Sequence, residues 1–144
     1  RKREASTDYY RIKVMEVLYH IEKTQIENRF DDRYFNREQV QITKGVKEYL
    51  ISHIDENISV EKLAVSSGIN INIFYKIFME IYGETPYAYL KRYRMNVAAV
   101  QLLTGERRIG DIAMELGYSN ASKFAKAFYS VYGELPREYR KKRR

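Results

Sequence analysis

The stretches YGETPYAY (residues 82–89) and YGELPREY (residues 132–139) are two versions of one motif in a chain of 144 residues. They agree at five of eight positions and contain both prolines of the sequence. A long motif that recurs at a distance of 50 residues is typical of a duplicated structural unit. The residues that precede each version therefore indicate what the unit is.

Each version follows two short apolar runs at helical spacing, separated by a glycine. Gly68 and Gly117 fall where the chain must turn with positive φ, and Ile69 and Tyr118 follow to fill the corner. Each copy is thus a predicted helix-turn-helix, whose second helix leaves one face free for the major groove of DNA. The apolar positions are Val60, Leu63, Ala64, Phe74, Ile77, Phe78 and Ile81 in the first copy, and Ile109, Ile112, Ala113, Leu116, Phe124, Ala127, Phe128 and Val131 in the second.

The remaining segments also have helical patterns. Residues 87–103 lack glycine and proline and predict a linker helix that Gly105 ends with a positive φ. Asn36 is predicted to cap a helix that ends near residues 55–57, and residues 9–23 predict a further helix, followed by a linker over residues 24–35. The expected first residues of the motif helices are Ser59 and Asn70 in the first copy and Ser119 in the second. No alternating strand pattern occurs, so the chain is predicted to be all-α.

Charge favours a polyanionic partner. The chain is 44% hydrophobic and 31% charged, with a net charge of +7. Residues 41–144 hold 17 Lys and Arg against 11 Asp and Glu, so +6 of that charge lies in the part with the repeat. Nucleic acid is the first partner that this balance suggests, and an anionic membrane surface is the second.

Several classes of site are excluded or disfavoured. The chain has no cysteine, which excludes disulfides, thiol catalysis and cysteine-ligated zinc. His20 and His53 are far apart, so no metal or other cofactor is predicted. No convergent acid, base or nucleophile stands out, so the chain is predicted not to be an enzyme. It also has no run of 18 apolar residues that would predict a membrane span and no visible signal peptide.

The chain resembles the DNA-binding domain of AraC/XylS-family bacterial transcription regulators over about residues 42–140. The resemblance rests on LAVSSGIN (63–70), IFYKIFMEIYGETPYAYLKRYRMNVAA (73–99) and IGDIAMELGYSNASKFAKAFYSVYGELPREYR (109–140). It implies seven helices in two homeodomain-like subdomains, which enter successive major-groove segments on one face of promoter DNA. The expected domain covers residues 37–144, with helix-turn-helix units at about 59–82 and 108–132 and a linker helix at about 86–104.

The resemblance also implies which residues read bases. The family's readers fall on Asn72, Tyr75 and Lys76 in the first copy, and on Ala121, Ser122, Ala125 and Lys126 in the second. Because two alanines offer only apolar contact, we expect the first copy to carry more hydrogen-bonded specificity. Arg107, Arg108 and Lys123 are expected to contact phosphates. The tail RKKRR (140–144) either contacts phosphate or is a solvated and disordered terminus.

The repeated motif itself is expected to be structural. Gly83 and Gly133 should end the second helix of each copy, and Pro86 and Pro136 should begin the next helix. The motif tyrosines, Tyr89 and Tyr139, should pack back on their own units.

Function follows from the resemblance. It implies a cytoplasmic, nucleoid-associated regulator, an activator beside RNA polymerase, with an effector sensed elsewhere. The helix at 9–23 resembles the end of a preceding sensing domain, since residues 1–36 lie outside the family's DNA-binding domain and the chain begins with Arg1 rather than Met. That helix either pairs with its copy in a homodimer or folds back. The alternative function is a protein-interaction module that keeps the fold without reading DNA sequence.

Overall fold

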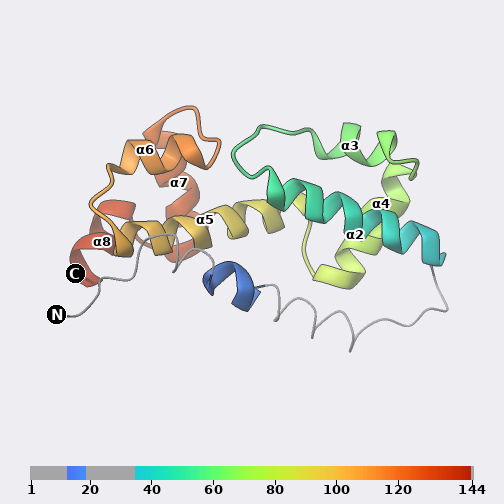
Figure 1. The fold of residues 1–144 in the computed structure, drawn as a ribbon, viewed down its shortest axis with the longest axis horizontal. Coiled ribbons are helices and arrows are strands. Elements are labelled where there is room, and N and C mark those ends of the chain that lie inside the picture. Colours follow the sequence, from blue (N-terminus) through green and yellow to red (C-terminus); the bar gives the residue numbers. More distant parts are fainter. Residues whose placement is uncertain (1–12, 19–34, 144) are drawn as a thin grey trace. The chain divides into compact units, whose positions relative to one another are not determined.

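The computed structural model describes residues 13–18 and 35–143, and the regular elements in those residues are α-helices (Figure 1). Residues 13–18 are helical, and the longer part contains α2 (Arg37–Ser52), α3 (Val60–Ser66), α4 (Ile71–Tyr82), α5 (Pro86–Thr104), α6 (Ile109–Glu115), α7 (Ala121–Tyr132) and α8 (Pro136–Arg143). The all-α prediction is confirmed. The rest of the helix predicted at residues 9–23, and nearly all of the linker predicted at 24–35, lie outside the described residues.

The described chain forms two compact units. One contains residues 35–90, and the other contains residues 13–18 and 91–143. The linker helix α5 begins in the first unit and ends in the second. In the second unit, the hydroxyl of Tyr93 on α5 contacts the sulfur of Met15. Each unit thus holds one of the two copies of the repeat.

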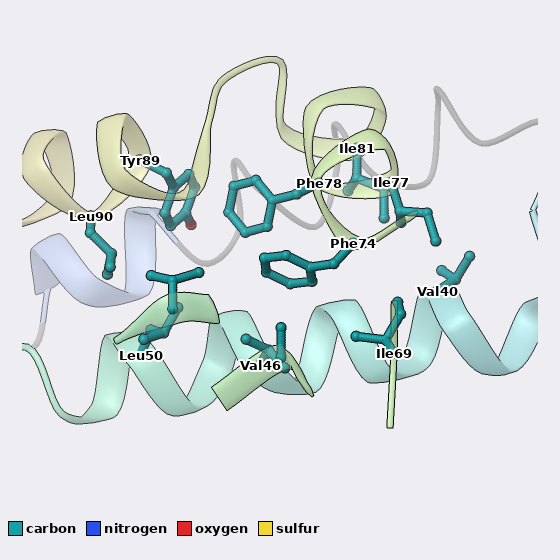
Figure 2. Packing of buried hydrophobic residues seen from close by; sticks show 12 residues of the cluster. Val40, Val46, Leu50, Ile69, Phe74, Ile77, Phe78, Ile81, Tyr89 and Leu90 are labelled. Carbon is teal, nitrogen blue, oxygen red and sulfur yellow. The ribbon is translucent and has the colours of Figure 1, made fainter. Parts of the chain in front are cut away.

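In the first unit, α2 packs against α3 and α4 around two phenylalanines. Figure 2 shows Phe74 and Phe78 pointing from α4 toward Val46 and Leu50 on α2. The four side chains are buried, and each is worth about 1.5–3 kcal/mol of transfer free energy. Tyr89 meets Phe78 edge to face, with ring centroids 5.5 Å apart, so the prediction that this motif tyrosine packs back on its unit is confirmed.

The second unit repeats this arrangement with different neighbours. Phe124 and Phe128 on α7 are fully buried, and Tyr139 on α8 meets Phe128 edge to face at 5.3 Å between centroids. On α5, Leu102 is also fully buried, and Asn96 accepts a hydrogen bond from the Tyr132 hydroxyl at 2.8 Å. The motif tyrosine of the second copy therefore has the predicted role as well.

The turn between the two helices of each copy has the same hydrogen bonds. Gly68 and Gly117 have φ of 88° and 81°, in the left-handed region, as predicted. The N–H groups of the next residues, Ile69 and Tyr118, donate back to Ala64 and Ala113 at 3.4 and 3.0 Å. Each glycine N–H donates to the third residue before it, which completes a Schellman motif at the end of α3 and of α6. Two local sequences thus produce the same turn.

The helix boundaries of the motif also agree with prediction. Gly83 and Gly133 cap α4 and α7 with φ of 73° and 72°, and Pro86 and Pro136 are the first residues of α5 and α8. Ser59 accepts from the N–H of Lys62 at the start of α3, and Asn70 accepts from two N–H groups at the start of α4.

Two predicted helix boundaries and one predicted glycine conformation were wrong. α7 is capped by Asn120, which accepts from the N–H of Lys123 at 2.8 Å, and not by Ser119. α2 ends at Ser52, before residues 55–57, and the Tyr49 carbonyl near that end accepts hydrogen bonds from the Ser52 hydroxyl and from Nδ1 of His53.

The third error concerns the end of α5. Gly105 does not have a positive φ, although α5 ends next to it at Thr104. The Leu102 carbonyl near that end accepts from Nε of Arg140 on α8 at 3.1 Å. A side chain from another helix thus occupies a terminal carbonyl that a left-handed glycine was expected to serve.

Candidate nucleic-acid interface

The expected base readers of the first copy share one side of α4. Asn72 and Lys76 are exposed, one helical turn apart, and Tyr75 lies next to Lys76 and is half-buried. The opposite side of α4 carries the buried phenylalanines, so the core fixes which side is presented to solvent. This polar face is the one that the sequence predicted for contact with DNA.

Tyr75 is tied to a carboxylate on the preceding helix. Its hydroxyl donates to Oε1 of Glu61 on α3 at 2.7 Å, and the hydroxyl of Tyr87 on α5 donates to Oε2 at 2.6 Å. The bonds from Tyr87 and then Tyr75 lower the pKa of Glu61 to about 2. Burial, followed by the bond to Glu61, raises the pKa of Tyr75 to about 12. At neutral pH the cluster is therefore one carboxylate that holds two protonated phenols.

The expected readers of the second copy lie on α7 without such a cluster. Ala121, Ser122 and Lys126 are exposed, and Ala125 is half-buried. The repeat offsets are 49 residues before the turn glycine and 50 after it. They place Gly110, Ala125 and Arg137 at the positions of Glu61, Tyr75 and Tyr87. The two faces that are expected to read bases thus differ in side chains and in the contacts behind them.

The three expected phosphate contacts differ in their environments. Arg108 and Lys123 are exposed. Arg107 instead forms a two-bond ion pair with Glu115 on α6, which raises the pKa of its guanidinium. Sequence reasoning gave Arg107 no partner, because it precedes α6 and lies outside the periodicity of that helix. Its positive charge is already balanced within the unit.

The basic tail is helical as far as Arg143, and three of its side chains form hydrogen bonds within the unit. Arg140 donates to the carbonyls of Leu102 and Arg107, and Lys142 and Arg143 both donate to Glu134 at 3.0 and 2.6 Å. Of the two alternatives for residues 140–144, a disordered terminus is wrong as far as Arg143, because these residues belong to α8. Lys142 and Arg143 are exposed to solvent, and contact with phosphate stays a prediction.

Sequence reasoning missed Glu61 and Tyr87. Glu61 follows the capping Ser59 by two residues, so it looked like an ordinary acidic residue in a first helical turn. Tyr87 follows Pro86 inside the motif, where only the repeated residues were interpreted. The difference between the two copies was the available signal: Glu61 and Tyr87 are replaced by Gly110 and Arg137, so these positions are not needed for the common fold.

Neither a metal site nor a membrane span stands out in the described ranges. Residues 13–18 and 35–143 contain no group of three His, Cys, Asp or Glu side chains that could hold a metal ion. None of the described helices is long and apolar enough to cross a membrane.

Comparisons with known proteins agree with this geometry. The profile of a family described as a helix-turn-helix domain matches residues 63–142, more than half of the chain. The regulatory protein SoxS of Salmonella typhimurium is 34% identical over 85 residues, which cover 59% of this chain and 79% of SoxS. The virulence regulon transcriptional activator VirF of Yersinia enterocolitica is 32% identical over 89 residues, 62% of this chain but 31% of VirF.

A solved structure supports the fold. The DNA-binding domain of the global transcriptional factor AdpA, in complex with a target DNA, matches with a TM-score of 0.65. The match covers 69% of this chain and 90% of that domain, at 23% sequence identity. At this identity, the likeness shows a common fold.

Proposed function

Since the chain belongs to the AraC/XylS family of DNA-binding transcription regulators, we propose that it reads promoter DNA in a sequence-specific way through α4 and α7. One observation carries the proposal: each copy buries its phenylalanine pair on one side of the second helix and leaves a solvent-facing side opposite. The major groove admits one α-helix presented in this way. Regulation rather than catalysis is the function of this family.

The base contacts that we propose differ between the copies. In α4, the Asn72 side chain can pair with both edge groups of adenine, and Lys76 can reach guanine. In α7, Ala121 and Ala125 offer apolar contact to a thymine methyl, with Ser122 and Lys126 as the polar partners. Arg108 and Lys123, both exposed, would contact phosphates, whereas the ion pair of Arg107 with Glu115 makes it a weaker candidate.

We also propose that the regulator activates transcription beside RNA polymerase. The support is the relative VirF, which is named a transcriptional activator. Pairing with a second copy through residues 9–23 stays a prediction. The competing function, a protein-interaction module, predicts binding that ignores DNA sequence.

Selection of bound duplexes from a random library, followed by fluorescence anisotropy, tests the proposal. We expect a selected duplex to bind at least about 10³-fold more tightly than a random one. Both affinities should fall steeply with salt, because phosphate neutralisation releases counterions. Salt-dependent binding without any enriched sequence would instead support the interaction module.

A further inference from the structure

The hydrogen bond between Tyr75 and Glu61 supports a further inference, which rests on the proposed function. We infer that Glu61 fixes Tyr75 as a hydrogen-bond acceptor, so that Tyr75 selects a base carrying an amino group in the major groove. Glu61 is then a positioning residue for specificity, although it lies on α3 and not on α4.

The inference follows from the single proton of a phenol. A tyrosine hydroxyl has one hydrogen to donate, and its oxygen can also accept. In the first unit that hydrogen points to Oε1 of Glu61 at 2.7 Å, which leaves only the oxygen lone pairs for another partner. In the major groove, adenine N6 and cytosine N4 donate, whereas guanine and thymine present only acceptors. The Tyr75 oxygen should therefore accept a hydrogen bond from the amino group of adenine or cytosine, and guanine or thymine should be disfavoured at that position.

The Tyr75 hydroxyl should keep donating to Glu61 rather than turn to donate to a base. A hydrogen bond from a hydroxyl to a carboxylate is about twice as strong as one between neutral groups. The pKa of Glu61, lowered to about 2, keeps the carboxylate ionised at neutral pH. Donation by Tyr75 to a guanine or thymine acceptor would break the bond to Glu61 and leave that charge facing an acceptor.

Two further contacts hold the pair in position. The Tyr87 hydroxyl occupies the other oxygen of Glu61 at 2.6 Å, which fixes the orientation of the carboxylate. The ring of Tyr75 packs against the core and meets Phe74 edge to face, with centroids 5.8 Å apart. The acceptor is thus set in place before DNA arrives.

The second copy is a natural contrast. Gly110 and Ala125 stand at the positions of Glu61 and Tyr75, so neither the carboxylate nor the hydroxyl is present. Selection of an amino-bearing base by this device should be confined to the base pairs that α4 contacts.

The test compares variants of the full chain on the duplex selected by the unchanged protein. Each base pair of that duplex is replaced in turn, and binding is measured by competition. Tyr75→Phe keeps the ring and removes the hydroxyl, so the base pair whose preference it alters identifies the contact. At that position we expect the unchanged protein to prefer adenine or cytosine about 10- to 100-fold over guanine or thymine, the range for one good base contact.

Glu61→Ala frees the proton of Tyr75 and should remove most of that preference, because the hydroxyl can then donate to guanine or thymine. Glu80→Ala, which removes an exposed carboxylate from α4, is the matched control and should leave the preference in place. Tyr87→Phe removes the other donor to Glu61 and should reduce the preference only in part, because the bond from Tyr75 to Oε1 remains. Circular dichroism checks the helical content of each variant. Tyr75→Phe leaves α3 unchanged and still tests the contact if Glu61→Ala does not fold.

Three results would overturn the inference alone. They are a preference for guanine or thymine at the Tyr75-dependent position, no position that depends on Tyr75, and an unchanged preference in a folded Glu61→Ala variant. If the unchanged protein selects no sequence at all, the proposed function fails and the inference fails with it. Selective binding without a role for Tyr75 leaves the proposed function intact.

Discussion

Arg140 and Arg107 are joined by a hydrogen bond of 2.6 Å from Nη2 of the first to the main-chain oxygen of the second. The same guanidinium donates through Nε to Leu102 at the end of α5. Arg140 thus ties α8 to both sides of the connection between α5 and α6, which also contains the exposed Arg108. An arginine at the start of a basic tail acts here as an internal brace.

Replacing Arg140 should destabilise the second unit. Hydrogen bonds from a charged group contribute about 1.5–3 kcal/mol each, and they are not fully additive. We expect Arg140→Ala to lower the free energy of unfolding by about 2–4 kcal/mol in urea. Lys141→Ala removes the same charge from an exposed neighbour and should change stability by less than about 0.5 kcal/mol. Equal effects of the two changes would show that the brace contributes nothing beyond its charge.

One substitution at two glycines should have opposite effects. A Cβ at Gly68 or at Gly45 would meet no atom within 4 Å, but Gly68 has φ of 88° whereas Gly45 lies inside α2 without a positive φ. Gly68→Ala should therefore cost about 1–2 kcal/mol of stability from the backbone alone. Gly45→Ala should gain about 0.5–1 kcal/mol. Thermal unfolding of both variants checks the signs, and a stabilising Gly68→Ala would contradict the role of the turn.

Lys76 should contribute to base discrimination. Lys76→Ala is expected to weaken binding to the selected duplex by about 1–3 kcal/mol and to relax selection at one or two base pairs. Lys126→Ala, the change at the equivalent position of the second copy, should affect different base pairs. Repeated selection with each variant measures both effects. A uniform loss across all sequences would reassign Lys76 to phosphate contact.

Acid should weaken the first unit through Glu61. Its folded pKa of about 2 lies below the ordinary 4.5, so the stabilisation is complete above pH 4.5 and is lost as the pH falls toward 2. Glu61→Gln removes this titration. We expect the difference in melting temperature between the unchanged protein and Glu61→Gln to shrink as the pH falls from 6 to 2.5. A difference independent of pH would mean that the carboxylate charge is not stabilised by the two phenols.

Local signals predicted most of the fold. Gly68, Gly117, Pro86 and Pro136 act through their own backbone preferences, which neighbours hardly change, and their predicted roles are confirmed. The prediction that Ser119 begins α7 was wrong, because serine and asparagine are similarly good N-caps. The 50-residue offset from Asn70 pointed to Asn120, which is the N-cap in the structure.

Contacts between distant residues account for what sequence could not supply. Gly105 was predicted to have a positive φ at the end of α5. Instead, Arg140, 35 residues later, donates to the Leu102 carbonyl near that helix end. Helical spacing placed Tyr75 away from the side of α4 that carries the buried Phe74 and Phe78, as the structure has it. The partner of its hydroxyl lies 14 residues earlier, where no periodicity connects the two.

Under the proposed function, the small side chains of α7 make this helix a convenient place to redesign sequence specificity. Phe124 and Phe128 hold the helix from its buried side, and neither Ala121 nor Ala125 offers a polar group to an existing network. A replacement of either alanine removes no side-chain hydrogen bond or ion pair, because alanine has no polar group, whereas a change at Tyr75 removes its bond to Glu61. An engineer seeking a new operator would therefore alter the second copy first and keep the first as an anchor.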